Sequence, residues 1–136
     1  MLGLLDISTS GLVAQRQRLD TIAGNIANAN ATRNADGEAT PFLRRFVSFH
    51  PEPQSASPQS GVGVGYTVDV DRSSPTRRVH EPGHPDADAD GYVTYPNIDV
   101  ITEFVNAMEA GRAYEANISA MEITKQLAEM SLQIIA

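Results

Sequence analysis

Apolar residues recur with a helical period at the beginning of the chain. Leucine or isoleucine stands at every seventh position, and the positions three residues later are small, uncharged or apolar. This a/d pattern predicts an amphipathic helix over residues 2–30. It fits either a helix packed on the core of its own chain or a coiled-coil strand that meets other helices. The residues expected to carry the packing are Leu5, Leu12, Leu19, Ile22 and Ile26.

A second, longer helix is predicted over residues 97–136. Pro96 closes the segment before it, Asn97 is a candidate N-cap, and Asp99 places a negative charge in the first turn. One apolar seam follows the helix in steps of four and three residues, and a second seam joins it from mid-helix at the same spacing. The seam residues expected at interfaces are Phe104, Tyr114, Ile118, Met121, Ile123, Leu127, Met130 and Leu132.

Two seams on one helix need two partners. A lone helical hairpin buries one face of each helix, so the second face of residues 113–135 would stay exposed and would mark an interaction surface. The alternative is a helix buried at the centre of a globule. The chain offers few other segments to surround such a helix, which favours the interaction surface.

Residues 31–96 have the pattern of strands and loops. Apolar residues alternate with glycine and polar residues from Val62 to Val70, which predicts a strand with its valines and Tyr66 on one face. Residues 42–50 are the expected partner strand, and residues 76–80 are a shorter third strand of the same small sheet. The Pro- and Ser-rich residues 51–61 predict an exposed, flexible loop between the first two strands.

These elements predict an α+β fold. We expect long N- and C-terminal helices paired as a coiled coil, with a small inserted antiparallel β region and extended loops. The expected organisation is an N-terminal helix at 1–30, which forms a helical core domain with the long C-terminal helix at 97–136. The β and loop region at 31–96 is inserted between them.

Composition narrows the classes of function. The net charge is −7 at pH 7, which argues against a nucleic-acid binder because phosphate contacts need Lys and Arg. The chain has no cysteine, which excludes disulfides, thiolate metal sites and cysteine catalysis. We expect no membrane-spanning segment, because no run of 18 apolar residues occurs. We also expect no cleaved secretory signal, because no basic region precedes the first apolar run.

The stretch HPDADADGYV, residues 84–93, has the spacing that begins a calcium loop. Counted from Asp86, the acids Asp88 and Asp90 and the glycine Gly91 are in register with an EF-hand. Position twelve is Asn97 rather than Glu, and the prolines before the loop forbid the helix that an EF-hand requires. The three like charges favour an extended connector, which basic pairs such as Arg44–Arg45 or Arg77–Arg78 of another copy would neutralise.

Other metal and enzyme signatures are weak. His80 and His84 stand near the same aspartates, but Pro82 and Gly83 between them prevent a rigid helical pair of ligands. No phosphate-binding loop and no spacing typical of a catalytic triad occurs in the sequence. We therefore expect no cofactor and no enzymatic activity.

Three motifs resemble a known family. The stretch SGLVAQRQRLDTIAGNIANANAT, from Ser10 to Thr32, is similar to the N-terminal signature of the axial proteins of the bacterial flagellum. PGHPDADADGYVTYPNIDV and AGRAYEAN, which begin at Pro82 and Ala110, resemble a proximal-rod member of that family, with Gly111 where the family motif has Ser. The family's Thr-x-Gly-Tyr is absent after the first motif. The motif residues are Asn25, Asn28, Asn30, His84, Pro85, Asp86, Asp88, Asp90, Gly91, Arg112, Tyr114 and Asn117.

The resemblance implies a structural subunit of the proximal rod in the flagellar basal body. Such proteins pair their terminal helices and stack into a helical tube around the export channel, which passes torque from the membrane ring to the distal rod and hook. The implied partners are other copies of the chain, other proximal-rod subunits, the distal-rod subunit and adaptor proteins of the membrane ring or export gate. The implied location is the rod within the periplasm, reached through the flagellar type III apparatus without signal cleavage.

Two readings from other classes remain open at this stage. The chain could be a calcium- or metal-binding module that uses residues 86–90, or a coiled-coil adaptor of no particular machine. The periodicity also leaves open which helix faces meet the same chain and which meet another. If the terminal helices order only on assembly, the free subunit would not polymerise early.

Overall fold

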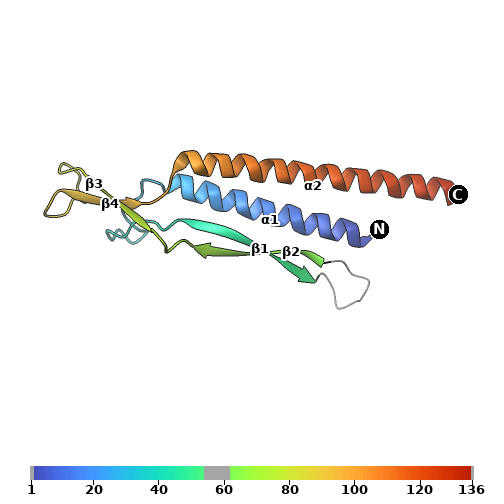
Figure 1. The fold of residues 1–136 in the computed structure, drawn as a ribbon, viewed down its shortest axis with the longest axis horizontal. Coiled ribbons are helices and arrows are strands. Elements are labelled where there is room, and N and C mark those ends of the chain that lie inside the picture. Colours follow the sequence, from blue (N-terminus) through green and yellow to red (C-terminus); the bar gives the residue numbers. More distant parts are fainter. Residues whose placement is uncertain (1, 54–61, 136) are drawn as a thin grey trace. The chain divides into compact units, whose positions relative to one another are not determined.

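The computed structural model describes residues 2–53 and 62–135, and its fold is α+β. The chain begins with helix α1 (Leu2–Ala27) and ends with helix α2 (Val100–Ile135), and four strands lie between them in the sequence (Figure 1). The strands are β1 (Arg45–Pro53), β2 (Val62–Val70), β3 (Thr76–His80) and β4 (Tyr92–Pro96). Residues 54–61, which include most of the predicted flexible loop, lie outside the described residues.

The chain forms two compact units. One consists of Met1–Leu19, Val47–Thr67 and Ala107–Ala136, and the other of Asp20–Phe46 and Val68–Asn106. We call the first, which contains both ends of the chain, the outer unit and the second the inner unit; the names refer to the order of segments in the sequence. The expected division into 1–30, 31–96 and 97–136 stays a prediction about domain organisation.

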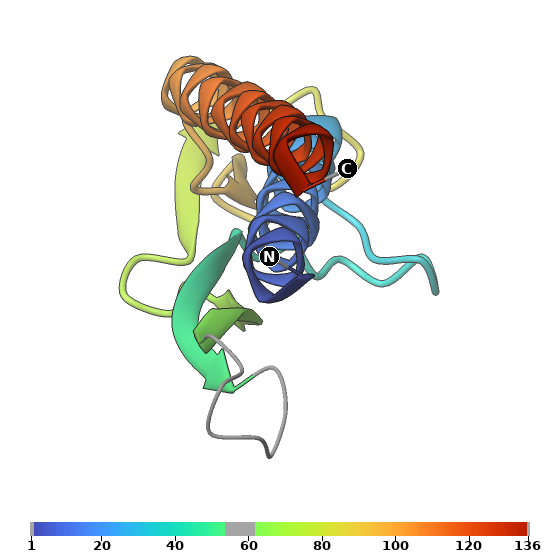
Figure 2. The same ribbon diagram turned by 90° about the vertical axis from the view of Figure 1, so that its right-hand side faces the viewer.

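In the outer unit, α1 lies between α2 and the β1–β2 ribbon (Figures 1 and 2). The guanidinium of Arg18 on α1 donates to Glu109 on α2 at 2.8 Å. On the other side of α1, the Ser10 hydroxyl accepts a hydrogen bond of 2.9 Å from the backbone N–H of Val64. Gly11 permits close approach of the helices, because an added Cβ would lie 3.1 Å from Nδ2 of Asn117.

Two predicted strands are confirmed and the sheet arrangement is corrected. Val62–Val70 and Thr76–His80 form strands with the predicted bounds, whereas the partner strand begins at Arg45 rather than at residue 42. The described strands form two separate two-stranded sheets, β1–β2 and β3–β4, rather than one sheet. The sequence analysis missed β4, which pairs antiparallel with β3 and places Val93 opposite Val79.

The alternation in β2 was read correctly, but its glycine side is the packed one. Gly63 and Gly65 are buried, whereas Val62 and Tyr66 are exposed. At Gly65 an added Cβ would lie 2.5 Å from Nε2 of His50. Gly65 therefore leaves space that side chains of β1 occupy, whereas Val62, Tyr66, Val68 and Val70 are exposed.

Asp99, not Asn97, caps α2. The Asp99 carboxylate accepts hydrogen bonds from the N–H of Ile101 and the hydroxyl of Thr102, which satisfy the first turn. These bonds, that of the Thr102 side chain first, hold the pKa of Asp99 below its usual range. Asn97 instead donates to the carbonyl of Ser74 at 3.0 Å. The helix begins three residues later than predicted because Asn97 is bonded instead to the segment before β3, where its N–H donates to the carbonyl of Pro75 at 3.2 Å.

Candidate assembly surfaces and the buried polar network

An apolar stripe on α2 is exposed in the outer unit. Ile123, Leu127, Met130 and Leu132 are each more than half exposed. The first three follow steps of four and three residues, so they lie on one side of the helix. Exposed apolar stripes of this length mark interaction surfaces.

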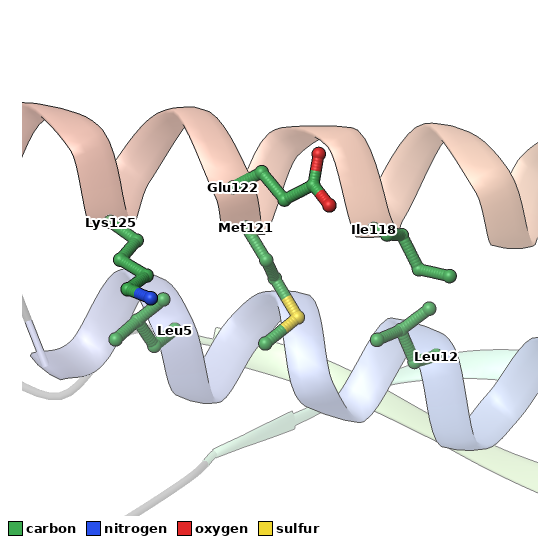
Figure 3. A pocket seen from close by; sticks show the side chains of 6 residues that line it. All are labelled: Leu5, Leu12, Ile118, Met121, Glu122 and Lys125. Atoms are coloured by element: carbon green, nitrogen blue, oxygen red, sulfur yellow. The ribbon is translucent and has the colours of Figure 1, made fainter.

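A groove of about 450 Å³ runs between α1 and α2 in the outer unit (Figure 3). Leu5 and Leu12 of α1 line it from one side, and Ile118, Met121, Glu122 and Lys125 of α2 line it from the other. The Met121 side chain extends from α2 toward α1, between the other lining residues (Figure 3). The predicted seam residues Leu5, Leu12, Ile118 and Met121 thus lie around one groove.

The remaining seam residues have mixed environments. Ile22 is buried, and Leu19, Ile26 and Tyr114 are half-buried. Phe104 is exposed, and the buried position next to it on α2 is Glu103. Of the five predicted seam residues on α1 only Ile22 is buried, and at the start of α2 the buried position lies one residue before the predicted seam.

The inner unit contains a buried polar network. The Asn25 amide donates to the carbonyl of Arg45 at 2.7 Å and to Oε2 of Glu103 at 3.0 Å, and it accepts a bond of 2.9 Å from the N–H of Arg45. Only 1% of Asn25 and 1% of Glu103 is exposed. The network satisfies the polar atoms that burial would otherwise leave without water.

Arg44 completes the network with a charge. Its Nε donates to Oε1 of Glu103 at 2.8 Å, and its Nη2 lies 2.7 Å from the same oxygen. Nη1 of Arg44 lies 3.8 Å from the carboxylate of Asp71, just after β2. The pKa of Asp71 is lowered chiefly by hydrogen bonds from Ser73, with a smaller contribution from Arg44. Three chain segments therefore meet at Glu103, and Arg44 links them to a fourth at Asp71.

The acidic connector is folded into turns and binds basic groups of its own chain, so the prediction that it is extended is wrong. Asp86 accepts hydrogen bonds from the Thr32 hydroxyl at 2.7 Å and from Nε of Arg33 at 2.8 Å. These bonds, that of Arg33 first, lower the pKa of the Asp86 carboxyl. Its side chain is only 6% exposed. The connector thus fastens the loop after α1 to the β3–β4 hairpin.

Asp88 shapes the turn of that hairpin. Its carboxylate accepts the N–H groups of Tyr92 at 2.8 Å and Asp90 at 3.0 Å, and it pairs with Arg78 of the same chain. The bond from Tyr92 is the largest cause of its lowered pKa. Gly91 has a φ of +79°, a conformation that favours glycine. Intrachain bonds and the glycine turn therefore define the shape of this turn, and the expected pairing of the acidic connector with another copy stays a prediction.

The histidines contribute to the same loop. Nδ1 of His84 accepts the N–H of Asp86 at 3.1 Å, and its ring packs edge-on against Tyr95. Across the described residues 2–53 and 62–135, no group of three or more His, Asp or Glu side chains is placed to hold a metal ion. Asp86 and Asp88 use their carboxylates in the bonds described above.

Other motif residues lie apart from this loop. Asn28 bonds to the carbonyl of Gly24 at 2.8 Å near the end of α1, and Asn30 is exposed just beyond it. Arg112 is exposed on α2, and Pro85 is exposed in the connector. The structure brings Asn25 together with Glu103, and Asp86 with Arg33, but it does not gather the motif residues into one site.

Sequence reasoning missed Glu103, Arg44, Thr32 and Arg33. No spacing signal distinguished Glu103, because Phe104 stands three residues before Ala107 and fits the 3–4 spacing of the helix equally well. The partners of Asp86 had no local signal, because Arg33 lies 53 residues away in the sequence.

Comparisons with known proteins identify the family. Residues 5–35 match the family model described as flagella basal body rod protein, and residues 89–134 match flagellar basal body rod FlgEFG protein C-terminal. The chain is 39% identical over 127 residues to the flagellar basal-body rod protein FlgC of Salmonella typhimurium, covering 93% of this chain and 92% of that protein. It is 36% identical over 142 residues to FlgC of Bacillus subtilis, covering 96% and 95%.

A FlgC of Escherichia coli O6:H1 is 41% identical over 128 residues, covering 93% of this chain and 92% of that protein. Among the described residues, no helix is both long and apolar enough to cross a membrane. The matches extend over both helices and the acidic connector at well above 30% identity. The chain belongs to the family of the flagellar basal-body rod protein FlgC.

Proposed function

We propose that this chain is a structural subunit of the proximal rod that polymerises helically into a tube around the export channel. A place in the basal-body rod follows from family membership. The proposal adds that the rod passes torque from the membrane ring toward the distal rod and hook. It also adds that the subunit has no catalytic activity.

The observation that carries the assembly proposal is the exposed apolar stripe Ile123, Leu127 and Met130 on α2. The groove lined by Leu12, Ile118 and Met121 belongs to the same unit and the same helix. A ridge and a groove at different places on one subunit favour heterologous contacts, which build open helical polymers rather than closed dimers. We propose that α1 and α2 pair as a coiled coil and that α2 also packs against a neighbouring copy.

Further partners and location are part of the same proposal. The subunit would contact other proximal-rod subunits, the distal-rod subunit and adaptor proteins of the membrane ring or export gate. It would reach the periplasmic rod through the flagellar type III apparatus without signal cleavage. A chain without cysteine is compatible with export in an unfolded state.

Substitution on the stripe tests the assembly surface. Leu127→Glu places a charge on an exposed residue, so the subunit should fold and accumulate while motility and rod assembly are lost. Gln133→Glu is the matched control, because it adds the same charge about a third of a turn away around α2. Motility in soft agar and purified basal bodies would be compared in a strain that lacks the native gene. A motile Leu127→Glu strain would contradict the proposed surface.

Substitution of one predicted seam residue on each helix tests the helix pairing. Leu19→Asp and Ile118→Asp should both block rod assembly while the protein is still produced. A regular helical array of this subunit in cryo-microscopy of motor particles would support the rod over a soluble adaptor. Motor particles whose rod lacks the chain would contradict the proposed function.

A further inference from the structure

The first turns of α2 present a charged residue inward and apolar residues outward. Glu103 is 1% exposed, whereas Ile101 is 75%, Phe104 is 57% and Val105 is 60% exposed. All four belong to the inner unit. Burial of apolar area would favour the opposite arrangement, because an aromatic side chain gains far more from burial than a carboxylate does.

A rotation of about 100° would exchange the two arrangements. Adjacent residues on a helix differ by that angle, so a turn of one position would bring Phe104 to the place of Glu103. The same turn would move Ile101 toward the inner face and Asn106 away from it. The hydrophobic effect is not directional, and it does not by itself resist this rotation.

The hydrogen bonds of the buried network resist this rotation, because they are directional. Both Glu103 oxygens are bonded, one to Nδ2 of Asn25 at 3.0 Å and the other to Nε of Arg44 at 2.8 Å. Asn25 is itself held by two bonds to the backbone of Arg45. A rotated α2 would leave these buried groups without their partners, which is costly. Buried polar groups of this kind add little net stability, and their best-attested role is to select one arrangement.

We propose that the network of Asn25, Glu103 and Arg44 fixes the rotational setting of the start of α2. It thereby keeps the face formed by Ile101, Phe104 and Val105 turned outward. The network thus determines which face of α2 is exposed to solvent. This role does not depend on the proposed rod assembly.

Single cysteines can report the rotation, because the chain has no cysteine of its own. Ile101→Cys and Asn106→Cys would each be introduced into the otherwise native full chain and into a chain that also carries Glu103→Leu. The rate of reaction with a thiol reagent is measured for each purified protein. With Glu103→Leu, we expect Ile101→Cys to react roughly tenfold more slowly, the ratio that burial of one aromatic side chain supports. Asn106→Cys should react faster.

The opposite changes at the two positions separate rotation from simple loosening, which would accelerate both. Glu103→Gln retains an acceptor oxygen for the network and should leave both rates close to those of the native background. Faster labelling at both positions, or no change at either, would overturn the proposal.

A second variant covers the case in which Glu103→Leu does not fold. In the double variant Arg44→Met and Glu103→Leu, both charged members are removed together, and Asn25 keeps its two bonds to the backbone of Arg45. It should show the same opposite changes in rate. If both variants react at the rate of the urea-unfolded protein at both positions, the network is required for folding rather than for the rotational orientation of α2. That result would contradict the proposal.

Discussion

Arg33 and Asp86, 53 residues apart in sequence, form an ion pair in which the guanidinium donates from both Nε and Nη2 to one carboxylate oxygen. The other oxygen of Asp86 accepts from Thr32 at 2.7 Å. The connection joins the loop after α1 to the turn between β3 and β4. It gives the acidic motif a structural role within one subunit.

The first prediction concerns acid sensitivity. Arg33 and Thr32 lower the pKa of Asp86 in the folded chain. The ionised Asp86 therefore makes its full contribution to the stability of the fold above the unfolded pKa of about 3.9. This contribution is lost as pH falls through the lower folded pKa. Asp86→Asn should therefore melt at a lower temperature than the native chain at pH 7, and the difference should shrink below about pH 4.

Thermal unfolding followed by circular dichroism at several pH values measures this. Asp90→Asn, which changes an exposed acid of the same loop, is the matched control. Asp71, Asp88 and Asp99 also have lowered pKa values, so some acid sensitivity should remain in Asp86→Asn. A difference between native chain and Asp86→Asn that stays constant down to pH 2 would speak against the assignment.

The second prediction separates backbone strain from crowding at glycines. Gly37 and Gly91 have φ values of +81° and +79°, but only Gly91 has neighbours where a Cβ would stand, at 3.1 Å from Nε2 of His80. Gly37→Ala should cost roughly 1–2 kcal/mol from strain, and Gly91→Ala should cost more. Gly83→Ala, with open space around it, should be close to neutral. Urea unfolding measures all three, and equal costs for Gly37→Ala and Gly91→Ala would refute the crowding.

The third prediction concerns the packing of β2. An added Cβ at Gly65 would lie 2.5 Å from Nε2 of His50 and 2.9 Å from Oε2 of Glu52. Gly65→Ala should therefore destabilise the chain, and His50→Ala in the same chain should restore part of the loss. A double-mutant cycle of unfolding free energies measures the coupling. Strictly additive effects would show that His50 does not occupy the space beside Gly65.

The fourth prediction concerns the helix ends in the free subunit. No described side chain is buried over residues 5–10 of α1 or 111–133 of α2. Local stability follows such burial, so these amides should exchange rapidly with solvent in dilute protein and become protected in assembled rods. Residues of the inner unit, such as Val93 and Asn25, should remain protected in both states. Full, cooperatively melting helix in the dilute subunit would contradict this order of events.

Periodicity was sufficient for the elements with long, regular patterns. The seven-residue repeat predicted α1 from Leu2, and strict alternation predicted the bounds of β2. It was insufficient for β4, because Tyr92–Pro96 is five residues long and ends in proline, which reads as a connector. The cap of α2 was misassigned because Asn97 and Asp99 are both good capping residues. The bonds that distinguish them, from Ile101 and Thr102 to Asp99 and from Asn97 to Ser74, are not visible in the sequence.

The sequence predicts the apolar faces of the helices but not the partner that covers each face. The spacing of Ile123, Leu127 and Met130 identifies a second helix face, but spacing does not reveal which face a partner covers. Phe104 was placed on the same seam as Tyr114 because hydrophobicity was the only guide. The bonds that turn Glu103 inward instead come from Asn25 and Arg44, which are distant in sequence. Long-range polar pairing of this kind has no periodic signature.

The hydrogen bonds between side chains of α1 and the backbone of the β1–β2 ribbon have a consequence for solubility. In the outer unit, the Ser10 hydroxyl accepts a hydrogen bond from the N–H of Val64. In the inner unit, the Asn25 side chain accepts from the N–H of Arg45 and donates to its carbonyl. An edge strand whose backbone groups are already bonded to helix side chains offers no template there for a strand of another molecule. The ribbon can therefore keep its valines exposed at lower risk of joining an amyloid-like stack before the subunit reaches its place.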